Sequence, residues 1–336
     1  MKRLVTGGGG FLGRSLMERL LALPNADVRC LVRSASQADR LRSLAATHPR
    51  ARLEIVPGNL LSRADAARAV EGVDMVYHLA ASLKGSPADI FMNTVVASNN
   101  VLEALASRPV TIVMVSSMGV YGTAALRRGS VVDERTPLEP HPERRDVYSH
   151  AKWRQEKLFR DRCAQAGHRL IIIRPGVVYG PGGSPMSARV GLNLFGLFLH
   201  LGGSNRIPLT YVDNCADAIV TASESPDAIG HAFNVVDDDL PTARGYLRRY
   251  RREVLRVRSV YVPYAGMWLV SRSVEWYHRR SRGQLPAVFT RYKTATLWKG
   301  TRFDNTKLKC IGWSPRVKTR EGLARSFAHL RSAARN

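Results

Sequence analysis

Short, mostly apolar runs alternate with longer stretches of helical periodicity along the first two thirds of the chain. The runs lie at 27–33, 52–56, 74–81, 110–115 and 169–173. Apolar runs of this length, separated by helical patterns, are typical of parallel strands that are buried on both faces. The pattern therefore predicts an α/β protein with a doubly wound parallel sheet. It also predicts further elements: a first strand before residue 7, helices at 63–70 and 88–106, a loop at 123–146, a helix from Tyr148, a short strand at 209–214 followed by a helix at 216–223, and a strand at 232–236.

Glycines follow the first expected strand, in the stretch Thr6-Gly-Gly-Gly-Gly-Phe-Leu-Gly13. Gly7, Gly10 and Gly13 are spaced Gly-x-x-Gly-x-x-Gly, a variant of the dinucleotide fingerprint, and a helical pattern begins directly after them. Such glycines allow a tight turn and let a pyrophosphate approach the free N–H groups of a helix N-terminus. A glycine-rich loop that holds no ligand would show the same pattern.

The second expected strand ends in Arg33, 20 residues after Gly13. An acidic residue there would bind the ribose of NAD, whereas an arginine can pair with the 2′-phosphate of NADP. We therefore expect NADP, with NAD as the alternative. A solvent-facing Arg33 beside an NAD site would fit the sequence as well.

Three polar residues are candidates for proton transfer. Ser117 follows the strand at 110–115, and ligands of open α/β sheets bind outside the carboxyl ends of the strands. Tyr148 and Lys152 are four positions apart, so they share one face of a helix. A nearby ammonium group stabilises a tyrosinate anion, which makes the tyrosine hydroxyl a usable base. A coincidental surface pair would be the other reading of Tyr148 and Lys152.

Composition places few limits on function. The chain has 336 residues, of which 45% are hydrophobic and 23% charged, which is ordinary for a globular protein. A strand beginning at residue 2 leaves no room for a signal peptide, and no run has the length and apolarity of a membrane span. Cys30, Cys163, Cys215 and Cys310 are far apart, so we expect free thiols, no metal site and a cytoplasmic location.

The net charge of +24 is unevenly distributed along the chain. Residues 240–336 hold 23 Lys or Arg against four Asp or Glu, a net charge of +19, whereas residues 1–239 carry only +5. Such a basic region suits an anionic partner, either a phosphate-bearing small molecule or an acidic membrane contacted through 244–282. Nucleic acid is a less favoured partner, and a merely solvated basic surface is the plain alternative. The aromatic stretch 261–277 could equally pack inward as a helix of a substrate-binding lobe.

The chain is expected to form two parts. Residues 1–182, with 206–236 returning to them, form the dinucleotide-binding domain. Residues 183–205 and 237–336 form a smaller, basic substrate-binding lobe. The glycine-rich, partly apolar stretch 183–205 could be a lid or a helix of that lobe.

These motifs together resemble the extended short-chain dehydrogenase/reductase family, which includes nucleotide-sugar epimerases, dehydratases and 3β-hydroxysteroid dehydrogenase-like enzymes. The resemblance implies a Rossmann-type domain and often a homodimer. The stretches that carry it are Thr6–Gly13, His78–Ala81, Ser116–Gly122, Tyr148–Lys152, Arg174–Pro181, Tyr211–Asn214 and, more weakly, Phe303–Leu308 with Gly312 and Trp313.

The resemblance also implies roles for individual residues. Tyr148 would exchange a proton with the substrate, Lys152 would lower the pKa of Tyr148 and hold the nicotinamide ribose, and Ser117 would orient the substrate oxygen. Met118 and Gly119 stand where 4,6-dehydratases carry an Asp-Glu pair, which argues against dehydration. Asn59 stands where many members have an Asp beside the adenine. The residues expected to contact the cofactor are Gly7, Gly10, Phe11, Leu12, Gly13, Arg33, Asn59, Leu60, Leu79, Ala80, Ala81, Asn93, Tyr148, Lys152, Pro175 and Val178.

The sequence thus predicts an NAD(P)-dependent oxidoreductase that transfers hydride at a secondary alcohol or carbonyl carbon. A nucleotide-linked sugar is the leading substrate because its diphosphate would suit the basic lobe. A nucleotide-sugar epimerase that retains NAD is the main alternative. A non-catalytic, NADP-sensing scaffold that binds nucleic acid or a membrane is a distant one.

Overall fold

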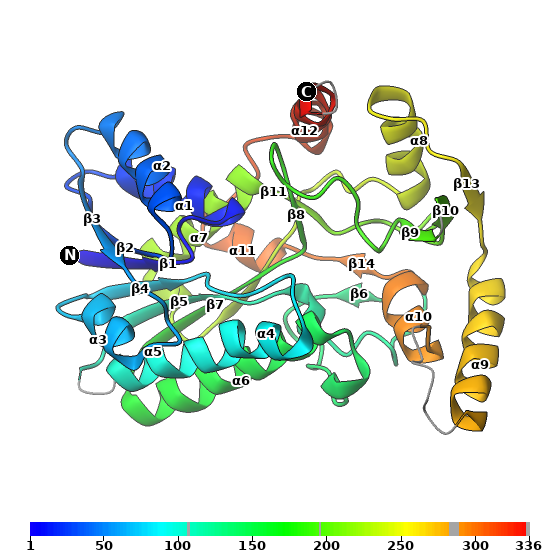
Figure 1. Cartoon of the computed structure of the whole chain (residues 1–336), viewed down its shortest axis with the longest axis horizontal. Helices are drawn as coiled ribbons and strands as arrows, with labels where there is room; N and C mark the ends of the chain where they lie inside the picture. The colour runs from blue at the N-terminus through cyan, green and yellow to red at the C-terminus, as the bar shows by residue number, and fades with distance from the viewer. Residues whose placement is uncertain (106–107, 195, 282–288, 334–336) are drawn as a thin grey trace.

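A seven-stranded parallel sheet forms the centre of the protein (Figure 1). The computed structural model describes residues 1–105, 108–194, 196–281 and 289–333. The strand order is β12-β7-β5-β4-β1-β2-β3, in which the chain winds outward in both directions from β1. This order is that of a doubly wound Rossmann-type sheet with one further strand, so the predicted fold class is confirmed. The strands are β1 (Lys2–Thr6), β2 (Asp27–Val32), β3 (Arg52–Pro57), β4 (Met75–His78), β5 (Thr111–Val115), β7 (Arg169–Pro175) and β12 (Ala232–Val235).

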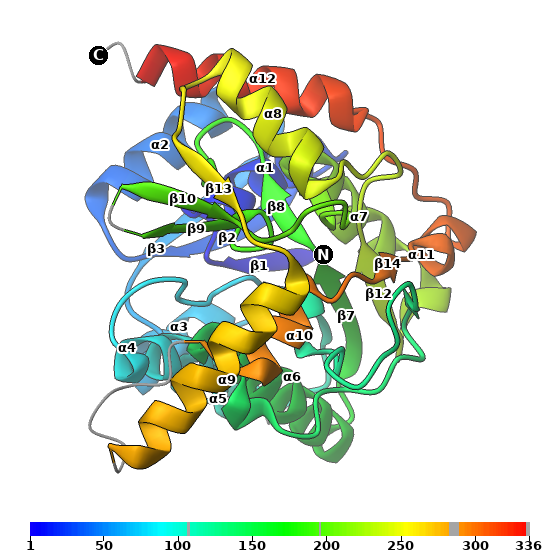
Figure 2. The same ribbon diagram turned by 90° about the vertical axis from the view of Figure 1, so that its right-hand side faces the viewer.

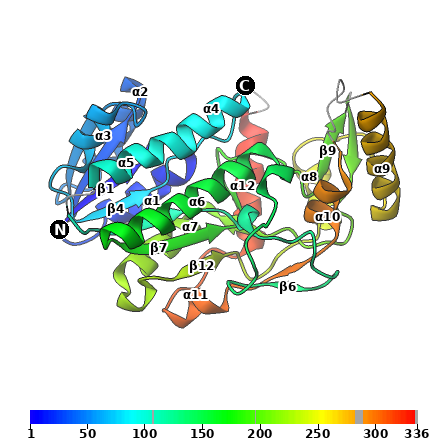
Figure 3. The same cartoon turned by 90° about the horizontal axis from the view of Figure 1, so that it is seen from below.

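Helices cover both faces of the sheet, as Figure 3 shows from below. Alternate residues of a strand point to opposite faces, so Val5 packs beneath one helix layer and Leu4 beneath the other. Apolar residues are needed at both positions, which explains why the strands are mostly apolar rather than alternating. One layer contains α1 (Phe11–Leu21), α2 (Ala35–Ala46) and α7 (Val212–Glu224), and the other α3 (Arg63–Val70), α5 (Ala97–Leu105) and α6 (Val147–Ala166).

The single helix expected at 88–106 is divided into three parts. A capping box of Ser86 and Asp89 starts α4 (Pro87–Phe91), a π-helical turn follows as η1 (Met92–Val96), and α5 continues to Leu105. Residue 106 lies outside the described residues. A π-turn adds one residue to the helical repeat and rotates the side chains that follow it, and such turns are frequent at functional sites.

Two strands within the stretch 183–205 form a hairpin, so of the two expected alternatives the helix is wrong and the lid stays a prediction. Strands β9 (Gly191–Leu194) and β10 (Leu197–His200) pair antiparallel, and Ser259–Tyr261 (β13) pairs parallel with β10. Gly196 has a φ of +80° in the turn, where its N–H donates to Asn193 Oδ1 at 3.1 Å. A left-handed residue closes a tight turn but ends a helix, which explains the difference. Phe195 lies outside the described residues.

The C-terminal lobe packs beside the carboxyl edge of the sheet (Figures 1 and 2). The arginine-rich helix α8 (Ala243–Glu253) packs side by side with α12 (Thr319–Ala333) in both views. Tyr246 and Tyr250 of α8 hold Phe327 of α12 between them, with ring centroids 5.6 and 5.8 Å apart. Further elements are α9 (Tyr264–Arg280), α10 (Arg291–Trp298), α11 (Thr306–Cys310), β6 (Val131–Val132), β8 (Val177–Tyr179), β11 (Leu209–Tyr211), β14 (Arg302–Phe303), η2 (Met118–Val120), η3 (Pro142–Arg144) and η4 (Pro226–Ala228).

Helix α9 carries the aromatic stretch and turns much of it outward. Met267 and Ser271 are buried against the lobe, but Trp276 is 65% exposed and Tyr277 52% exposed. Leu269 and Val270 are exposed as well. Among the described residues, no helix is both long and apolar enough to cross a membrane.

Candidate active site

The glycine turn between β1 and α1 is closely packed and leaves its helix end open. Gly7 has a φ of +75° and its carbonyl accepts from Gly10 N at 3.0 Å. A Cβ on Gly7 would lie 3.0 Å from Ala80 N, and a Cβ on Gly13 would collide with Gly7 O. No side chain caps the first N–H groups of α1. A tight turn without side chains at an uncapped helix N-terminus fits a dinucleotide pyrophosphate.

Ser117 and Tyr148 lie together at the carboxyl end of β5. Ser117 is the N-cap of η2, where its Oγ accepts from Gly119 N at 3.1 Å, and it also forms a hydrogen bond with the Tyr148 hydroxyl. Tyr148 is in the first turn of α6, two residues after the N-cap Asp146. The Tyr148 residue is half-buried, yet its hydroxyl is desolvated. Burial, together with the nearby Asp146 carboxylate, raises the pKa of Tyr148 to about 12, and the hydrogen bond with Ser117 opposes that rise.

Lys152 is 2% exposed and lies one turn along α6 from Tyr148. Its Nζ donates to Val115 O at 2.6 Å and to Gln155 Oε1. Burial lowers the pKa of Lys152 to about 7, against the attraction of Glu156. Desolvation of the phenol dominates the pKa of Tyr148, and the ammonium group of Lys152 is bound to Val115 and Gln155. The expected lowering of the pKa of Tyr148 by Lys152 stays a prediction.

Gln155 links Lys152 to a buried polar cluster beneath the end of β4. Its Nε2 donates to Ser98 Oγ at 2.7 Å and to Ala80 O at 3.1 Å, and it lies 3.3 Å from His78 Nε2. His78 Nδ1 lies 3.0 Å from Thr6 Oγ1, and burial lowers the pKa of His78 to about 3, so its ring is neutral. Sequence reasoning missed Gln155 as a positioning residue. Its place three residues after Lys152, on the same helix face, could have revealed it.

A second buried network holds the strand ends in place. Glu156 is fully buried and accepts from Ser116 Oγ at 2.6 Å and from Arg174 Nη2 at 2.5 Å. Arg174 also donates to the Tyr121 hydroxyl at 2.8 Å, which in turn donates to Asn234 Oδ1 at 2.7 Å. Burial alone would raise the pKa of Glu156, but Arg174 lowers it, so the carboxylate stays charged. The network connects β5, α6, β7 and β12.

Arg33 lies just beyond β2 and is exposed. Its Nη1 donates to Asn93 Oδ1 at 3.4 Å, and Asn93 Nδ2 donates to Asp89 O at 2.9 Å from within the π-turn. The geometry thus brings together two expected cofactor residues 60 positions apart. Asn59 is exposed after β3, and its side-chain oxygen accepts from Leu61 N at 3.1 Å. That oxygen is therefore used within the turn.

The other expected cofactor residues lie along the carboxyl ends of the strands. The fourth strand is shorter than expected and ends at His78, so Leu79, Ala80 and Ala81 follow it in an irregular segment that passes Gly7. Pro175 ends β7, two residues beyond the expected end at residue 173. The remaining positions are Phe11 and Leu12 in the first turn of α1, Leu60 after β3, and Val178 in β8.

Arg189 is a further residue that the sequence did not indicate. Burial, together with the nearby Arg145, lowers the pKa of its guanidinium to about 10, against the attraction of Asp146. Asp146 therefore lies close to both Arg189 and Tyr148. Arg189 stands just before β9, in a stretch with no motif, so only the fold places it near the candidate site.

Metal binding and disulfides have no support among the described residues. No cluster of His, Cys, Asp or Glu with the arrangement of a metal site is present in the described ranges. Cys30, Cys163 and Cys215 are buried free thiols, and Cys310 is an exposed one.

Comparison with known proteins places the chain among dinucleotide-dependent enzymes. The model of the NAD dependent epimerase/dehydratase family matches residues 3–235. An uncharacterised UDP-glucose epimerase of Bacillus subtilis is 29% identical over 70% of this chain and 76% of its own length. A 2-alkyl-3-oxoalkanoate reductase of Shewanella oneidensis is 26% identical over 97% of this chain and 85% of its own length.

A solved structure has the same fold over the whole length. The UDP-glucuronic acid 4-epimerase of Bacillus cereus, in complex with NAD, superposes with a TM-score of 0.74 and 20% identity, covering all of this chain and 98% of its own.

Proposed function

This chain belongs to the NAD-dependent epimerase/dehydratase family, an NAD(P)-dependent group of extended short-chain dehydrogenases/reductases, and we propose that it transfers hydride at a secondary alcohol or carbonyl carbon with Tyr148 as acid/base. The observation that carries the proposal is the hydrogen-bonded Ser117–Tyr148 pair at the carboxyl end of β5, beside the buried ammonium group of Lys152. A scaffold without catalysis would have no use for burying a lysine and a phenol side by side.

Ser117 and Tyr148 both act on the substrate oxygen, in different roles. A bound nicotinamide ring supplies or accepts the hydride. Ser117 orients the oxygen by a hydrogen bond, and Tyr148 exchanges a proton with it. A phenol with a pKa of about 12 is protonated at neutral pH, so Tyr148 is set up to donate a proton, as reduction of a carbonyl requires. In this proposal Lys152, held by Val115 and Gln155, binds the nicotinamide ribose, which is the role that the family resemblance implies for it.

Replacing Tyr148 tests the mechanism. Tyr148→Phe keeps the ring and removes the proton, so we expect a loss of turnover of about 10²–10⁴-fold. Cofactor affinity, measured by fluorescence titration, should stay close to that of the parent protein. A variant that turns over at the parental rate would refute the role of Tyr148.

The preferred cofactor in this proposal is NADP. Arg33 has no carboxylate partner within the described residues and is exposed where a 2′-phosphate would lie. We expect tighter binding of NADPH than of NADH, with NADPH weakened at least about tenfold in Arg33→Asp. Arg50→Asp, an exposed change after α2, is the charge-matched control. Equal binding of the two cofactors by the parent protein would leave NAD as the cofactor.

A nucleotide-linked sugar is the proposed substrate class. The support is the desolvated Arg189 near Tyr148, which suits a phosphate group, together with a relative named as a UDP-glucose epimerase. Epimerisation with retained NAD is the second candidate. A nucleotide-sugar panel separates the two by net change of NADPH absorbance, and a 3-oxoalkanoate belongs in the panel because the relative of widest coverage reported above is a reductase of that class.

We also propose contact with a membrane and formation of a homodimer. The exposed Leu269, Val270 and Trp276 on α9, near exposed Arg272 and Arg279, support contact with an acidic membrane. Of the expected membrane segment 244–282, residue 282 lies outside the described residues. Sedimentation with phosphatidylserine vesicles tests this contact, and Trp276→Ser should weaken it. Light scattering tests the expected homodimer.

A further inference from the structure

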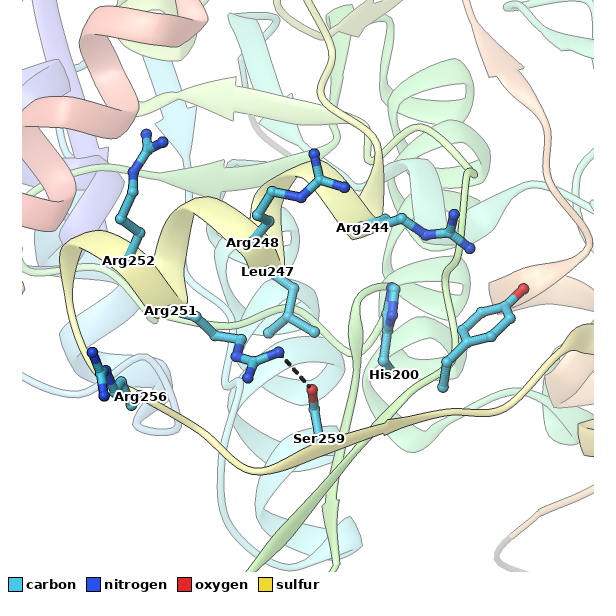
Figure 4. Close-up of a pocket in the computed structure, with 9 residues that line it drawn as sticks. His200, Arg244, Leu247, Arg248, Arg251, Arg252, Arg256 and Ser259 are labelled. Carbon is cyan, nitrogen blue, oxygen red and sulfur yellow. Dashed lines mark hydrogen bonds between the residues drawn. The ribbon is translucent and has the colours of Figure 1, made fainter.

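A basic concavity of about 640 Å³ lies in the C-terminal lobe, between α8 and β13 (Figure 4). Five arginines surround it: Arg244, Arg248, Arg251, Arg252 and Arg256. His200 of β10 stands between them and β13. None of the residues proposed above for the cofactor or for catalysis lines this concavity, so it is separate from the candidate active site.

The arrangement of the arginines is not explained by folding. Arg244, Arg248 and Arg251 recur at helical spacing, so they form one stripe along α8, and like charges at this spacing destabilise a helix. The carboxylate of Glu253, at the end of α8, is shared between Arg249 at 2.9 Å and Arg252 at 3.1 Å. Positive charge therefore remains in excess around the concavity.

Several of these guanidinium groups are available to a ligand. Arg251 makes one long hydrogen bond, 3.4 Å to Ser259 Oγ, and Arg244 lies over the Tyr261 ring at 5.3 Å. Arg248 and Arg256 have no hydrogen bond or ion pair within the described ranges, and both are exposed. Guanidinium groups bind phosphate through paired N–H donors.

His200 gives an independent sign of a ligand. It is 6% exposed, and its Nε2 has no hydrogen-bond partner among the described residues. Its ring packs on Tyr261 at 5.4 Å, which directs it into the concavity beside Arg244, as Figure 4 shows. A buried polar nitrogen without a partner costs free energy. A ligand oxygen would satisfy it.

We propose that this concavity, here called the arginine pocket, binds a ligand with at least two phosphate groups in addition to the substrate. Five arginines carry more positive charge than a ligand with a single carboxylate would neutralise. The volume of the concavity is large enough for a diphosphate or a bisphosphorylated ring. The phosphates come either from a free metabolite or from a lipid headgroup, since the exposed Leu255 and Val260 lie next to the arginines. The proposal does not depend on the reaction proposed above.

The first experiment uses inorganic pyrophosphate and the full-length protein with saturating NADP⁺, which occupies the glycine turn. We expect saturable binding by calorimetry, weakened at least about tenfold in Arg248→Ala/Arg256→Ala because two charge-assisted hydrogen-bond donors are lost. His200→Phe should also weaken binding, although it leaves the arginines intact.

The matched control is Arg127→Ala/Arg128→Ala, which removes the same charge from an exposed loop elsewhere. It should bind pyrophosphate as the parent protein does. Equal losses in the two double variants, or no saturable binding by the parent, would overturn the proposal.

A second experiment identifies the source of the phosphates. Phosphatidylcholine vesicles with and without phosphatidylinositol bisphosphate are sedimented with the parent protein and with Arg248→Ala/Arg256→Ala. Binding that requires both the bisphosphate lipid and the two arginines supports a headgroup. Pyrophosphate binding without vesicle binding supports a free ligand.

Discussion

The parallel sheet and the C-terminal lobe differ in how their charged side chains are placed. Beneath the sheet's carboxyl edge, buried charges are paired, as Glu156 is with Arg174. In the C-terminal lobe, charges are exposed and unbalanced, with a net +19 over residues 240–336. A buried charge is tolerable only when it is paired, whereas an exposed surplus costs little and attracts anions. The paired charges thus fix the geometry of the residues at the sheet edge, and the exposed charges of the C-terminal lobe provide a surface that can bind anions.

The largest effect is expected from breaking the buried pair. Glu156→Gln leaves Arg174 charged and buried without its carboxylate, so the free energy of unfolding should fall by about 3–5 kcal/mol. The exposed pair Lys157–Asp161 on the same helix is the control, and Asp161→Asn should cost at most about 0.5 kcal/mol. Urea denaturation measures both. Equal losses of unfolding free energy in the two variants would mean that burial of the Glu156–Arg174 pair does not affect its contribution to stability.

A second effect concerns the pH dependence of stability. The pKa of Lys152 is about 7 in the folded chain and 10.5 as its ordinary value, so the unfolded chain binds more protons between these values. Stability contributed by this group therefore rises as the pH increases from 7 toward 10.5, by a few kcal/mol at about 1.4 kcal/mol per pKa unit.

The Lys152→Met variant isolates this contribution. The difference in unfolding free energy between the parent and the variant should change with pH across that window and stay constant below pH 7. A difference that is independent of pH would show that Lys152 remains an ammonium group throughout.

Two helical glycines allow the same substitution to be compared across the two parts. A Cβ on Gly13 collides with backbone atoms of Gly7, whereas a Cβ on Gly266 in α9 meets nothing closer than 3.6 Å. Gly13→Ala should cost about 1–3 kcal/mol and weaken cofactor binding. Gly266→Ala should stabilise by about 0.5–1 kcal/mol, because alanine favours a helix. Thermal unfolding with and without NADP⁺ distinguishes the effects of the two substitutions. A Gly13→Ala variant that is more stable than the parent protein would contradict the close packing of the glycine turn.

The smallest effect is expected on the outer face of the lobe. Trp276 is 65% exposed, so Trp276→Ser should change the free energy of unfolding by no more than about 0.5 kcal/mol. Urea denaturation measures this. A loss above about 2 kcal/mol would show that the residue is buried in solution, for instance against a second copy of the chain.

The sequence predicted the sheet well because its strands are buried on both faces. Val5 and Leu4 must both be apolar, and such runs are readable without tertiary information. The hairpin at 191–200 was not predictable in this way, since Leu194 and Leu197 are partly exposed and the turn depends on the backbone of Gly196.

The candidate site was only partly readable from the sequence for a similar reason. Motifs indicate Ser117, Tyr148 and Lys152, but the partners that position them come from other elements. Gln155 contacts residues 57 and 75 positions away, and Arg189 reaches Asp146 only through the fold. The pKa of Tyr148 also depends on desolvation, which no spacing reveals.

The edge strand β12 has a consequence for how the chain is synthesised. It pairs with β7 from 60 residues further along, and Asn234 within it binds Tyr121. A nascent chain that has emerged only to residue 182 exposes the unpaired edge of β7 and leaves Tyr121 without that partner. Unpaired edges invite association with other chains. Translation must therefore proceed past Val235 before the ribosome-bound protein is protected, and slow elongation between the two strands would be expected to increase its dependence on chaperones.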